Sequence, residues 1–209
     1  MAYELFNSKA PWIMALLMRD FDLVLDDGCA ILGNIGHECG GFKLFQEQKP
    51  LVPGSRGGFG WAQWTGPRRR AFEAYCARNK LDPKSDQANY GFLFVELSGS
   101  ESAAITKVKA AKGLRAKVRA FEAAFERAGV KHYDSRDTWA IRARAAWDAV
   151  DGKPTIPEWA QKPASGSKPS PAQSPEAERQ EQPAAEPEPK RGILAILFEI
   201  IGKLLRGKS

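Results

Sequence analysis

Cysteine and histidine are scarce in this chain. The cysteines are Cys29, Cys39 and Cys76, an odd set without CxxC spacing, and the histidines are His37 and His132. This set indicates neither a disulfide framework nor a zinc site. Two histidines also leave a metal centre or a histidine-based catalytic triad short of components. We therefore expect a protein without metal or other cofactor, whose cysteines stay reduced in the cytoplasm where the chain is made.

Long apolar runs are also absent. Residues 10–18 form an apolar stretch, but it is short, is interrupted by Pro11 and lacks a clean small-residue cleavage site. We expect it to be a core helix rather than an export signal. Near the C-terminus the longest uninterrupted apolar run, 193–198, has six residues, well short of the ~20 that a membrane-spanning helix needs.

A concentrated charge of one sign is missing as well. The chain has a formal net charge of +6 and a pI of about 9.3. That sign favours a polyanionic partner, and nucleic acid, anionic lipid and an acidic cell-wall polymer all fit it. The excess of lysine and arginine is spread thinly along the sequence, without the basic cluster that nucleic-acid binders carry. We therefore expect no nucleic-acid partner.

The chain does contain helical periodicity. From Ser8 to about Val150, apolar residues recur at helical spacing between glycine-rich breaks, and strand signals are few. The stretch 42–64 differs, because its glycines, prolines and alternating polar and aromatic residues favour a small β-hairpin in the wall of a cleft. The pattern predicts a mainly α domain with helices at about 8–19, 27–37, 67–79, 86–97, 101–110, 114–128 and 135–150.

Two further segments follow this domain. From Pro154 to Pro189 the chain is rich in Pro, Ala, Ser, Glu, Gln and Lys, and such a segment buries too little apolar surface to offset its ordering entropy. We expect a flexible, disordered linker there. Residues 190–209 have the pattern of an amphipathic helix with basic flanks. For residues 192–206 three roles stay open: contact with a membrane or outer envelope, self-association or partner docking, and packing on the chain's own domain. The expected boundaries are 1–153, 154–189 and 190–209.

Glu38 is the strongest functional signal. It falls at the end of an apolar predicted helix that contains Ile31, Leu32 and Ile35, and two glycines that would break the helix and open a cleft follow one residue later. Cleavage of a glycosidic bond needs a carboxylic acid that stays protonated near neutral pH, which burial among apolar groups favours. We therefore interpret Glu38 as a general acid. The alternative is a solvated glutamate on an amphipathic helix.

Further catalytic groups are expected in the loop that follows. Glu47 lies nine residues after Glu38 and fits a group that orients or activates water, as in an inverting pair of carboxylates. Gln63 fits a partner for an N-acetyl group or for the attacking water, and Thr65 fits a partner for water. The alternatives are a solvated loop charge for Glu47, and capping of a helix that begins near Pro67 for Gln63 and Thr65.

The same loop and the segments after it hold candidate substrate contacts. Sugar rings stack on aromatic faces, which predicts contacts from Phe59, Trp61 and Trp64. Arg68 fits a partner for the lactyl or peptide carboxylates of a cell wall, or a solvated charge in the first turn of a helix. The hydroxyl of Tyr90 points either into the cleft or to a partner in the core.

Four ordered motifs carry a resemblance to a known family, namely ILGNIGHECGGF at 31–42, GFGWAQWTGPRR at 58–69, YGFLFVELSGS at 90–100 and FEAAFERAG at 121–129. The sequence resembles the phage tail lysozyme family over about residues 8–150, and more distantly it is similar to goose-type lysozymes and lytic transglycosylases. The distant relatives commonly have serine after the glutamate, where this chain has Cys39. Adjacent helical residues diverge by about 100°, so we expect Cys39 to be a buried thiol rather than a nucleophile paired with His37.

The resemblance implies a mostly α-helical lysozyme-like fold and cleavage of peptidoglycan glycan strands, with Glu38 matching the catalytic glutamate. Our hypothesis is a phage or prophage hydrolase that cuts between N-acetylmuramic acid and N-acetylglucosamine. It would be made in the host cytoplasm and act on the wall when released at lysis or carried on a phage particle. The alternatives are a lytic transglycosylase, a non-catalytic glycan-binding tail component, and a lytic effect of the C-terminal helix on membranes.

Overall fold

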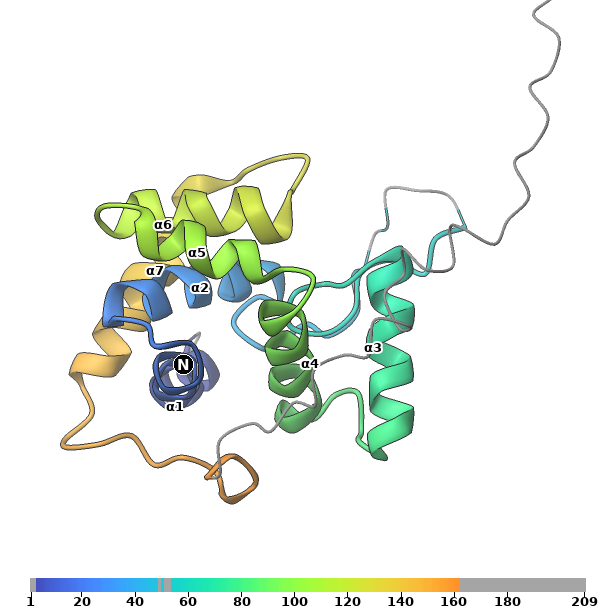
Figure 1. The fold of residues 1–209 in the computed structure, drawn as a ribbon, viewed down its shortest axis with the longest axis horizontal. Coiled ribbons are helices and arrows are strands. Elements are labelled where there is room, and N and C mark those ends of the chain that lie inside the picture. Colours follow the sequence, from blue (N-terminus) through green and yellow to red (C-terminus); the bar gives the residue numbers. More distant parts are fainter. Residues whose placement is uncertain (1–2, 49, 51–53, 162–209) are drawn as a thin grey trace, which may run out of the picture. The chain divides into compact units, whose positions relative to one another are not determined.

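A computed structural model describes residues 3–48, 50 and 54–161. Within them the chain is mainly α-helical, as the periodicity predicts (Figure 1). The hairpin expected in 42–64 is reduced to two isolated antiparallel bridges, Gln46 with Phe59 and Phe59 with Trp64, and the described residues form no sheet. The elements are α1 (Glu4–Phe21), α2 (Leu25–Glu38), α3 (Gly66–Asn79), α4 (Asp86–Ser98), α5 (Ser102–Ala110), α6 (Leu114–Phe121), the π-helical turn η1 (Glu122–Glu126), α7 (Tyr133–Asp148) and the 3-10 turn η2 (Glu158–Ala160).

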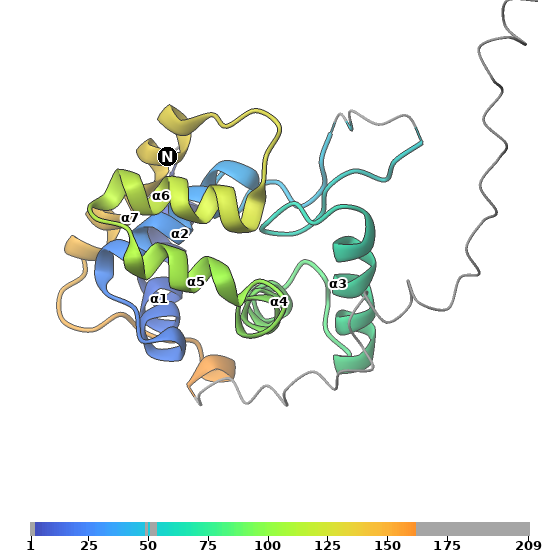
Figure 2. The same ribbon diagram turned by 45° about the horizontal axis from the view of Figure 1, so that its top comes forward.

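Helix α2 is the central element of the fold. Every residue from Asp27 to Gly36 is buried, and the helix packs against α1, α6 and α7 (Figures 1 and 2). A helix that is buried on all sides has no need of a polar face, which explains its run of small and apolar residues. The last residue of this central helix is Glu38, so the candidate acid sits on a rigid support.

Two glycines in α2 allow α7 to approach closely. A Cβ atom added to Gly33 would lie 2.7 Å from the Cβ of Ala140 and 2.7 Å from the carbonyl oxygen of Arg136. One added to Gly36 would lie 2.9 Å from the ring of Phe6 and 3.0 Å from the ring of Trp139. The absence of side chains at these positions therefore sets the distance between α2 and the first half of α7.

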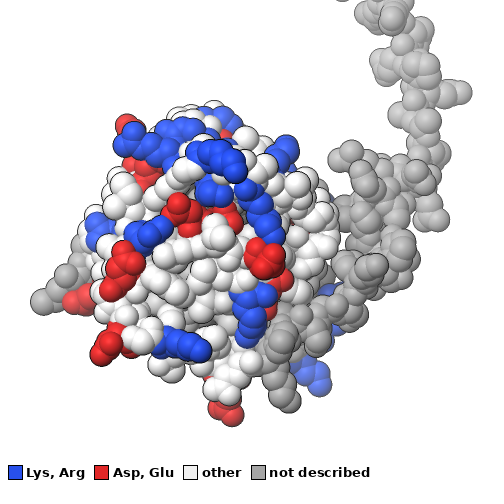
Figure 3. All heavy atoms as spheres, turned by 60° about the vertical axis from the view of Figure 1, so that its left-hand side comes forward, with Lys and Arg blue, Asp and Glu red and all other residues white. Residues whose placement is uncertain are grey.

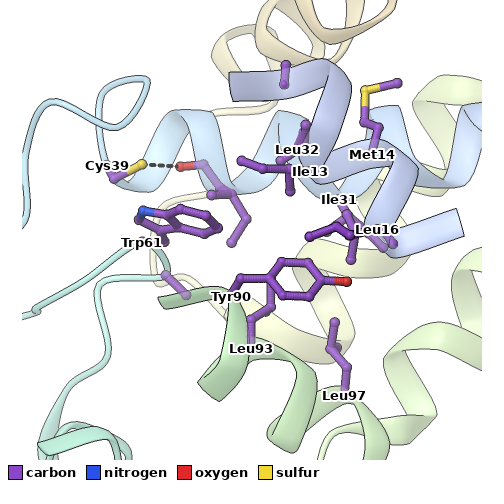
Figure 4. Close-up of a cluster of buried hydrophobic side chains, with 14 of the residues drawn as sticks. Ile13, Met14, Leu16, Ile31, Leu32, Cys39, Trp61, Tyr90, Leu93 and Leu97 are labelled. Atoms are coloured by element: carbon purple, nitrogen blue, oxygen red, sulfur yellow. Dashed lines mark hydrogen bonds between the residues drawn. The ribbon is translucent and has the colours of Figure 1, made fainter. Parts of the chain in front are cut away.

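An apolar cluster joins the remaining helices to this centre. Figure 4 shows Trp61 and Tyr90 beside side chains from α1, such as Ile13 and Leu16, and from α2, such as Ile31. Burial of each large side chain of this kind contributes about 1.5–3 kcal/mol to stability.

None of the helices in the described part of the chain is long and apolar enough to cross a membrane.

Helix α1 begins earlier than its capping signal predicts. It starts at Glu4 rather than near Ser8, so Pro11 lies inside the helix and not in its first turn. The reason is packing: the ring of Phe6, upstream of the expected start, is fully buried and extends the apolar face of the helix by a turn.

The folded domain extends past residue 153. The turn η2 packs on α1, because the Arg19 guanidinium donates to its last carbonyl (2.7 Å) and the ring of Trp159 lies 5.9 Å from that of Trp12. The first residues of the expected linker therefore belong to the domain. The remainder of the linker and the amphipathic helix expected at 190–209 lie outside the described residues.

We predict that Gly33→Ala lowers the free energy of unfolding by about 1–3 kcal/mol, because overpacking forces α2 and α7 apart. Gly28→Ala, in the same helix, is the matched control. Its added Cβ would lie 3.5 Å from the nearest atom of Met14, an ordinary contact, so we expect no loss and up to about 1 kcal/mol of gain. Urea unfolding of both variants checks this, and equal effects at the two positions would contradict it.

Candidate active site

Glu38 stands where the chain leaves α2 and reverses direction. Its side chain is 20% exposed. Gly40, Gly41 and Phe42 follow with φ angles of 56°, 67° and 69°, three successive residues in the left-handed region that favours glycine. A Cβ on Gly41 would also lie 2.6 Å from the ring of Trp139. The two glycines thus end the helix and leave the glutamate at the edge of the loop 42–64.

A buried arginine holds the Glu38 carboxylate. Nη2 of Arg136 donates to Oε1 of Glu38 at 2.6 Å, Nη1 donates to Oδ1 of Asn34 at 3.0 Å, and Nε donates to the carbonyl of Lys131 at 2.8 Å. The Arg136 side chain is 1% exposed. The guanidinium therefore fixes the carboxylate from the interior side. Sequence reasoning missed this residue, whose only signal is an arginine in the first turn of α7.

A second glutamate lies near Glu38. Glu126 is the last residue of the π-helical turn η1, and its Oε1 atom is buried without a hydrogen-bond partner. Burial and the negative charge of Glu38 raise the pKa of Glu126 well above the ordinary 4.5, against the opposing effect of Arg68 and Arg136. Sequence reasoning placed Glu126 in a family motif but gave it no role.

Arg68, expected to meet carboxylates of the substrate, binds a carboxylate of the protein. Its Nε and Nη2 atoms donate to Glu96 at 2.7 and 2.8 Å, and Nη1 donates to the carbonyl of Phe125 at 3.1 Å. The indole of Trp64 donates to Glu96 at 2.6 Å. This network ties α3 and α4 to η1, so the structure gives Arg68 a positioning contact next to Glu126.

Glu47 and Gln63 are both engaged within the loop. Oε2 of Glu47 accepts a hydrogen bond from the Gly58 amide at 2.7 Å, and Nε2 of Gln63 donates to the carbonyl of Gly60 at 2.8 Å. Thr65 precedes α3 as its N-cap residue, but its side chain makes no capping hydrogen bond and the residue is exposed. Of the three expected water partners, Thr65 is exposed, whereas Glu47 and Gln63 are half-buried.

The structure differs from expectation for Trp61 and Trp64, and for Tyr90 it shows the core orientation, one of the two that the sequence left open. Trp61, Trp64 and Tyr90 are 0%, 1% and 2% exposed, and the Tyr90 hydroxyl donates to Asp20 at 2.8 Å. Buried rings cannot stack on a sugar, so these three form the core beneath the loop. Phe59 is half-buried and retains an exposed ring surface.

The thiols are inert and the histidine beside Glu38 is neutral. Cys29, Cys39 and Cys76 are all buried and free. The Cys39 thiol donates to the carbonyl of Ile35 (Figure 4) and accepts from the amide of Phe42, two bonds that a serine hydroxyl also makes. Burial raises the pKa of Cys39 to about 12 and lowers that of His37 to about 4.

Charged groups elsewhere on the domain are mixed in sign. Figure 3 shows one face on which basic and acidic side chains surround an uncharged central area, in line with the thin spread of charge along the sequence. Among the described residues no group of three or more histidine, cysteine, aspartate or glutamate side chains could hold a metal ion.

Comparison with known proteins gives one family. The model of the family described as Phage tail lysozyme matches residues 13–146, a segment that runs from α1 to α7 and includes Glu38, Glu126 and Arg136. Neither the curated proteins nor the solved structures gave a match.

We predict that iodoacetamide does not modify Cys39 in the native protein. With a pKa of about 12, only about one thiol in 10⁴ is ionised at pH 8, and the thiolate is the reactive form. Peptide mass spectrometry after a timed exposure checks this, with the urea-unfolded protein as the positive control. Stoichiometric modification of Cys39 before unfolding would contradict the prediction.

We predict that Arg136→Lys lowers the free energy of unfolding by about 2–3 kcal/mol, because an ammonium cannot serve three divergent acceptors as the guanidinium does. Arg115→Lys is the control, since the Arg115 side chain is 79% exposed in its ion pair with Asp137 and exposed pairs contribute about 0–1 kcal/mol. Chemical denaturation measures both, and equal losses would mean that Arg136 does not act as an anchor.

Proposed function

The chain belongs to the phage tail lysozyme family, and on that premise we propose that it hydrolyses the β-1,4 bond between N-acetylmuramic acid and N-acetylglucosamine in peptidoglycan. The family makes it a peptidoglycan-degrading enzyme. The bond and the roles of the residues are our proposal. The observation that carries it is the Glu38 carboxyl group, partly exposed at the end of the central helix and held from the interior by Arg136.

In this proposal Glu38 is the general acid. It gives its proton to the glycosidic oxygen as the bond from that oxygen to the sugar carbon breaks, and Arg136 stabilises the carboxylate that remains. Water then forms the new bond to the sugar carbon, and its proton returns to a carboxylate. Thr65, with its exposed hydroxyl, is the best supported of the three candidates for positioning that water, and Glu47 and Gln63 shape the loop beside it.

The substrate contacts are proposed from exposure and charge. Phe59 offers a partly exposed ring for a sugar face, whereas Trp61, Trp64 and Tyr90 support the loop from below. Arg68 is engaged by Glu96, but Arg70, one turn into the same helix, is exposed and suits a lactyl or peptide carboxylate. The net charge of +6 favours approach to such an acidic polymer.

A lytic transglycosylase is the second candidate. In that reaction the 6-hydroxyl of the muramyl residue replaces water, and one carboxyl group acts first as acid and then as base. The engagement of Glu47 Oε2 by the Gly58 amide and of Gln63 Nε2 by the Gly60 carbonyl supports it, because each group has one polar atom committed to the loop rather than to water.

The place of action is part of the proposal. We propose that the chain is made in the host cytoplasm and reaches the wall when released at lysis or carried on a phage particle. Contact of residues 192–206 with a membrane or outer envelope, or self-association through them, stays a prediction. No nucleic-acid partner is proposed.

We predict that Glu38→Gln reduces the release of muropeptides from purified cell wall by about 10²-fold or more, the usual contribution of a general acid. Glu158→Gln is the control, because Glu158 is an exposed glutamate of η2, and we expect full activity from it. Mass spectrometry of the products identifies the reaction: reducing ends indicate a hydrolase and 1,6-anhydro ends indicate a transglycosylase.

Two results would count against the proposal. Near wild-type activity of Glu38→Gln would remove Glu38 from the reaction. Binding of wild-type protein to the wall without any product would identify a non-catalytic glycan-binding component instead of an enzyme.

A further inference from the structure

The π-helical turn η1 carries two glutamates in contrasting surroundings. Glu122 is fully buried and has three donors: the amide of Ala128 at 2.9 Å, the ammonium of Lys131 at 3.0 Å and the hydroxyl of Tyr133 at 3.1 Å. Glu126, four residues later, has a buried Oε1 atom with no partner. A buried oxygen without a hydrogen bond is costly and rare. Its presence next to the candidate acid therefore calls for a functional explanation.

The position of Glu126 is set by its own turn. The rings of Phe121 and Phe125 stack at 4.8 Å, Arg68 donates to the carbonyl of Phe125, and the left-handed residue Arg127 ends the turn. Single π-helical turns occur often at functional sites. These contacts fix the backbone of the turn on both sides of Glu126, and the charges of Glu38 and Arg136 act on its carboxyl group.

The charges that face Glu126 balance only when one carboxyl group is protonated. They are Glu38 at the end of α2, Arg68 on α3, Glu96 on α4 and Arg136 on α7, and the neutral thiol of Cys39 lies nearby. Arg136 pairs with Glu38 at 2.6 Å and Arg68 pairs with Glu96 at 2.7 Å. Two guanidinium groups therefore match two carboxylates. An ionised Glu126 would add an unmatched charge on a half-buried side chain whose Oε1 atom is fully buried, which is costlier than a neutral acid.

We propose that Glu126 and Glu38 share a single proton, which rests on Glu126 in the free enzyme and passes through Glu38 to the leaving oxygen of the substrate. This inference rests on the proposed function, in which Glu38 is the general acid. Glu126 is thereby the source of the proton that Glu38, held by Arg136, gives to the substrate. Glu126 is accordingly a positioning residue that acts through Glu38.

The shared proton leaves the pair of glutamates and returns to it once in each catalytic cycle. The Glu126 carboxyl group loses its proton to the Glu38 carboxylate, and Glu38 gives that proton to the glycosidic oxygen as the bond breaks. Three carboxylates then face two guanidinium groups, so the cluster carries one net negative charge opposite a transition state with positive charge on the sugar ring. The nucleophile, water or the muramyl hydroxyl, bonds to the sugar carbon and returns its proton to the pair.

The first test is the pH profile of wall degradation by the full chain and by Glu126→Gln. The amide cannot hold the shared proton, so Glu38 loses the neighbour from which it takes that proton. We expect activity at pH 7 to fall about tenfold or more, the alkaline limb of the profile to move by about one pH unit or more toward acid, and activity to recover near pH 5. Glu126→Asp, which retains a carboxyl group, should keep the limb closer to that of the wild type.

Glu122→Gln is the matched control for this profile. It also replaces a buried glutamate of η1, but one that holds the segment 127–133 rather than a proton. We expect it to lower stability while leaving the alkaline limb in place. An unchanged profile in Glu126→Gln, or an equal loss of activity at every pH, would overturn the proposal.

The second test does not depend on catalysis. Because folding raises the pKa of Glu126, its neutral form contributes stability that is fully present below the unfolded pKa of about 4.3 and is lost as the pH rises through the folded value. Glu126→Gln removes that loss. Urea unfolding should therefore show that the free energy of unfolding of the variant rises relative to that of the wild type between pH 4 and pH 8. A constant difference between the two free energies over this range would overturn the proposal. Absence of wall degradation by the wild type would instead overturn the proposed function, and the stability measurement would still report on the proton of Glu126.

Discussion

The buried guanidinium of Arg136 is the contact on which the arrangement of the site depends. It joins Asn34 and Glu38 on α2 to the carbonyl of Lys131 before α7, and Asn34 in turn donates to the carbonyl of Val118 on α6. Such a contact is possible only because Gly33 lets α7 approach α2. The position of the Glu38 carboxylate thus follows from the packing of helices, which is more rigid than a loop and suits a group that must be held in one orientation.

The described residues of the loop 42–64 (42–48, 50 and 54–64) are held in place without a sheet. Besides the backbone hydrogen bonds at its two bridges, side chains satisfy further backbone groups: Glu47 binds the Gly58 amide, Gln63 binds the Gly60 carbonyl, and Arg69 donates to the carbonyl of Gly57 at 2.9 Å. Polar residues that suggest catalysis in the sequence therefore also have a structural purpose. Beneath this loop the side chains of Trp61 and Trp64 are buried in the apolar core.

The sequence was sufficient for the helices and for placing Glu38 at a helix end, but not for the partners of Glu38. Apolar periodicity reports which face of a segment is buried, and a helix end followed by glycines is a local signal, so both can be recognised in one chain. The contact between Glu38 and Arg136 spans 98 residues, and no local pattern encodes it. Trp61 and Trp64 were misread for a related reason: composition indicates that these loop residues lie near the cleft, but only the fold determines that they face inward.

The three buried, free thiols have a consequence for the covalent state of the domain. Cys29, Cys39 and Cys76 are packed in the interior, and Cys39 bonds to the backbone at the end of α2 as a hydroxyl would. No disulfide links one helix of the described domain to another, so its stability draws nothing from oxidation. The domain therefore has the same covalent connections in a reducing compartment and in an oxidising one, and its folding does not have to wait for a change of redox environment.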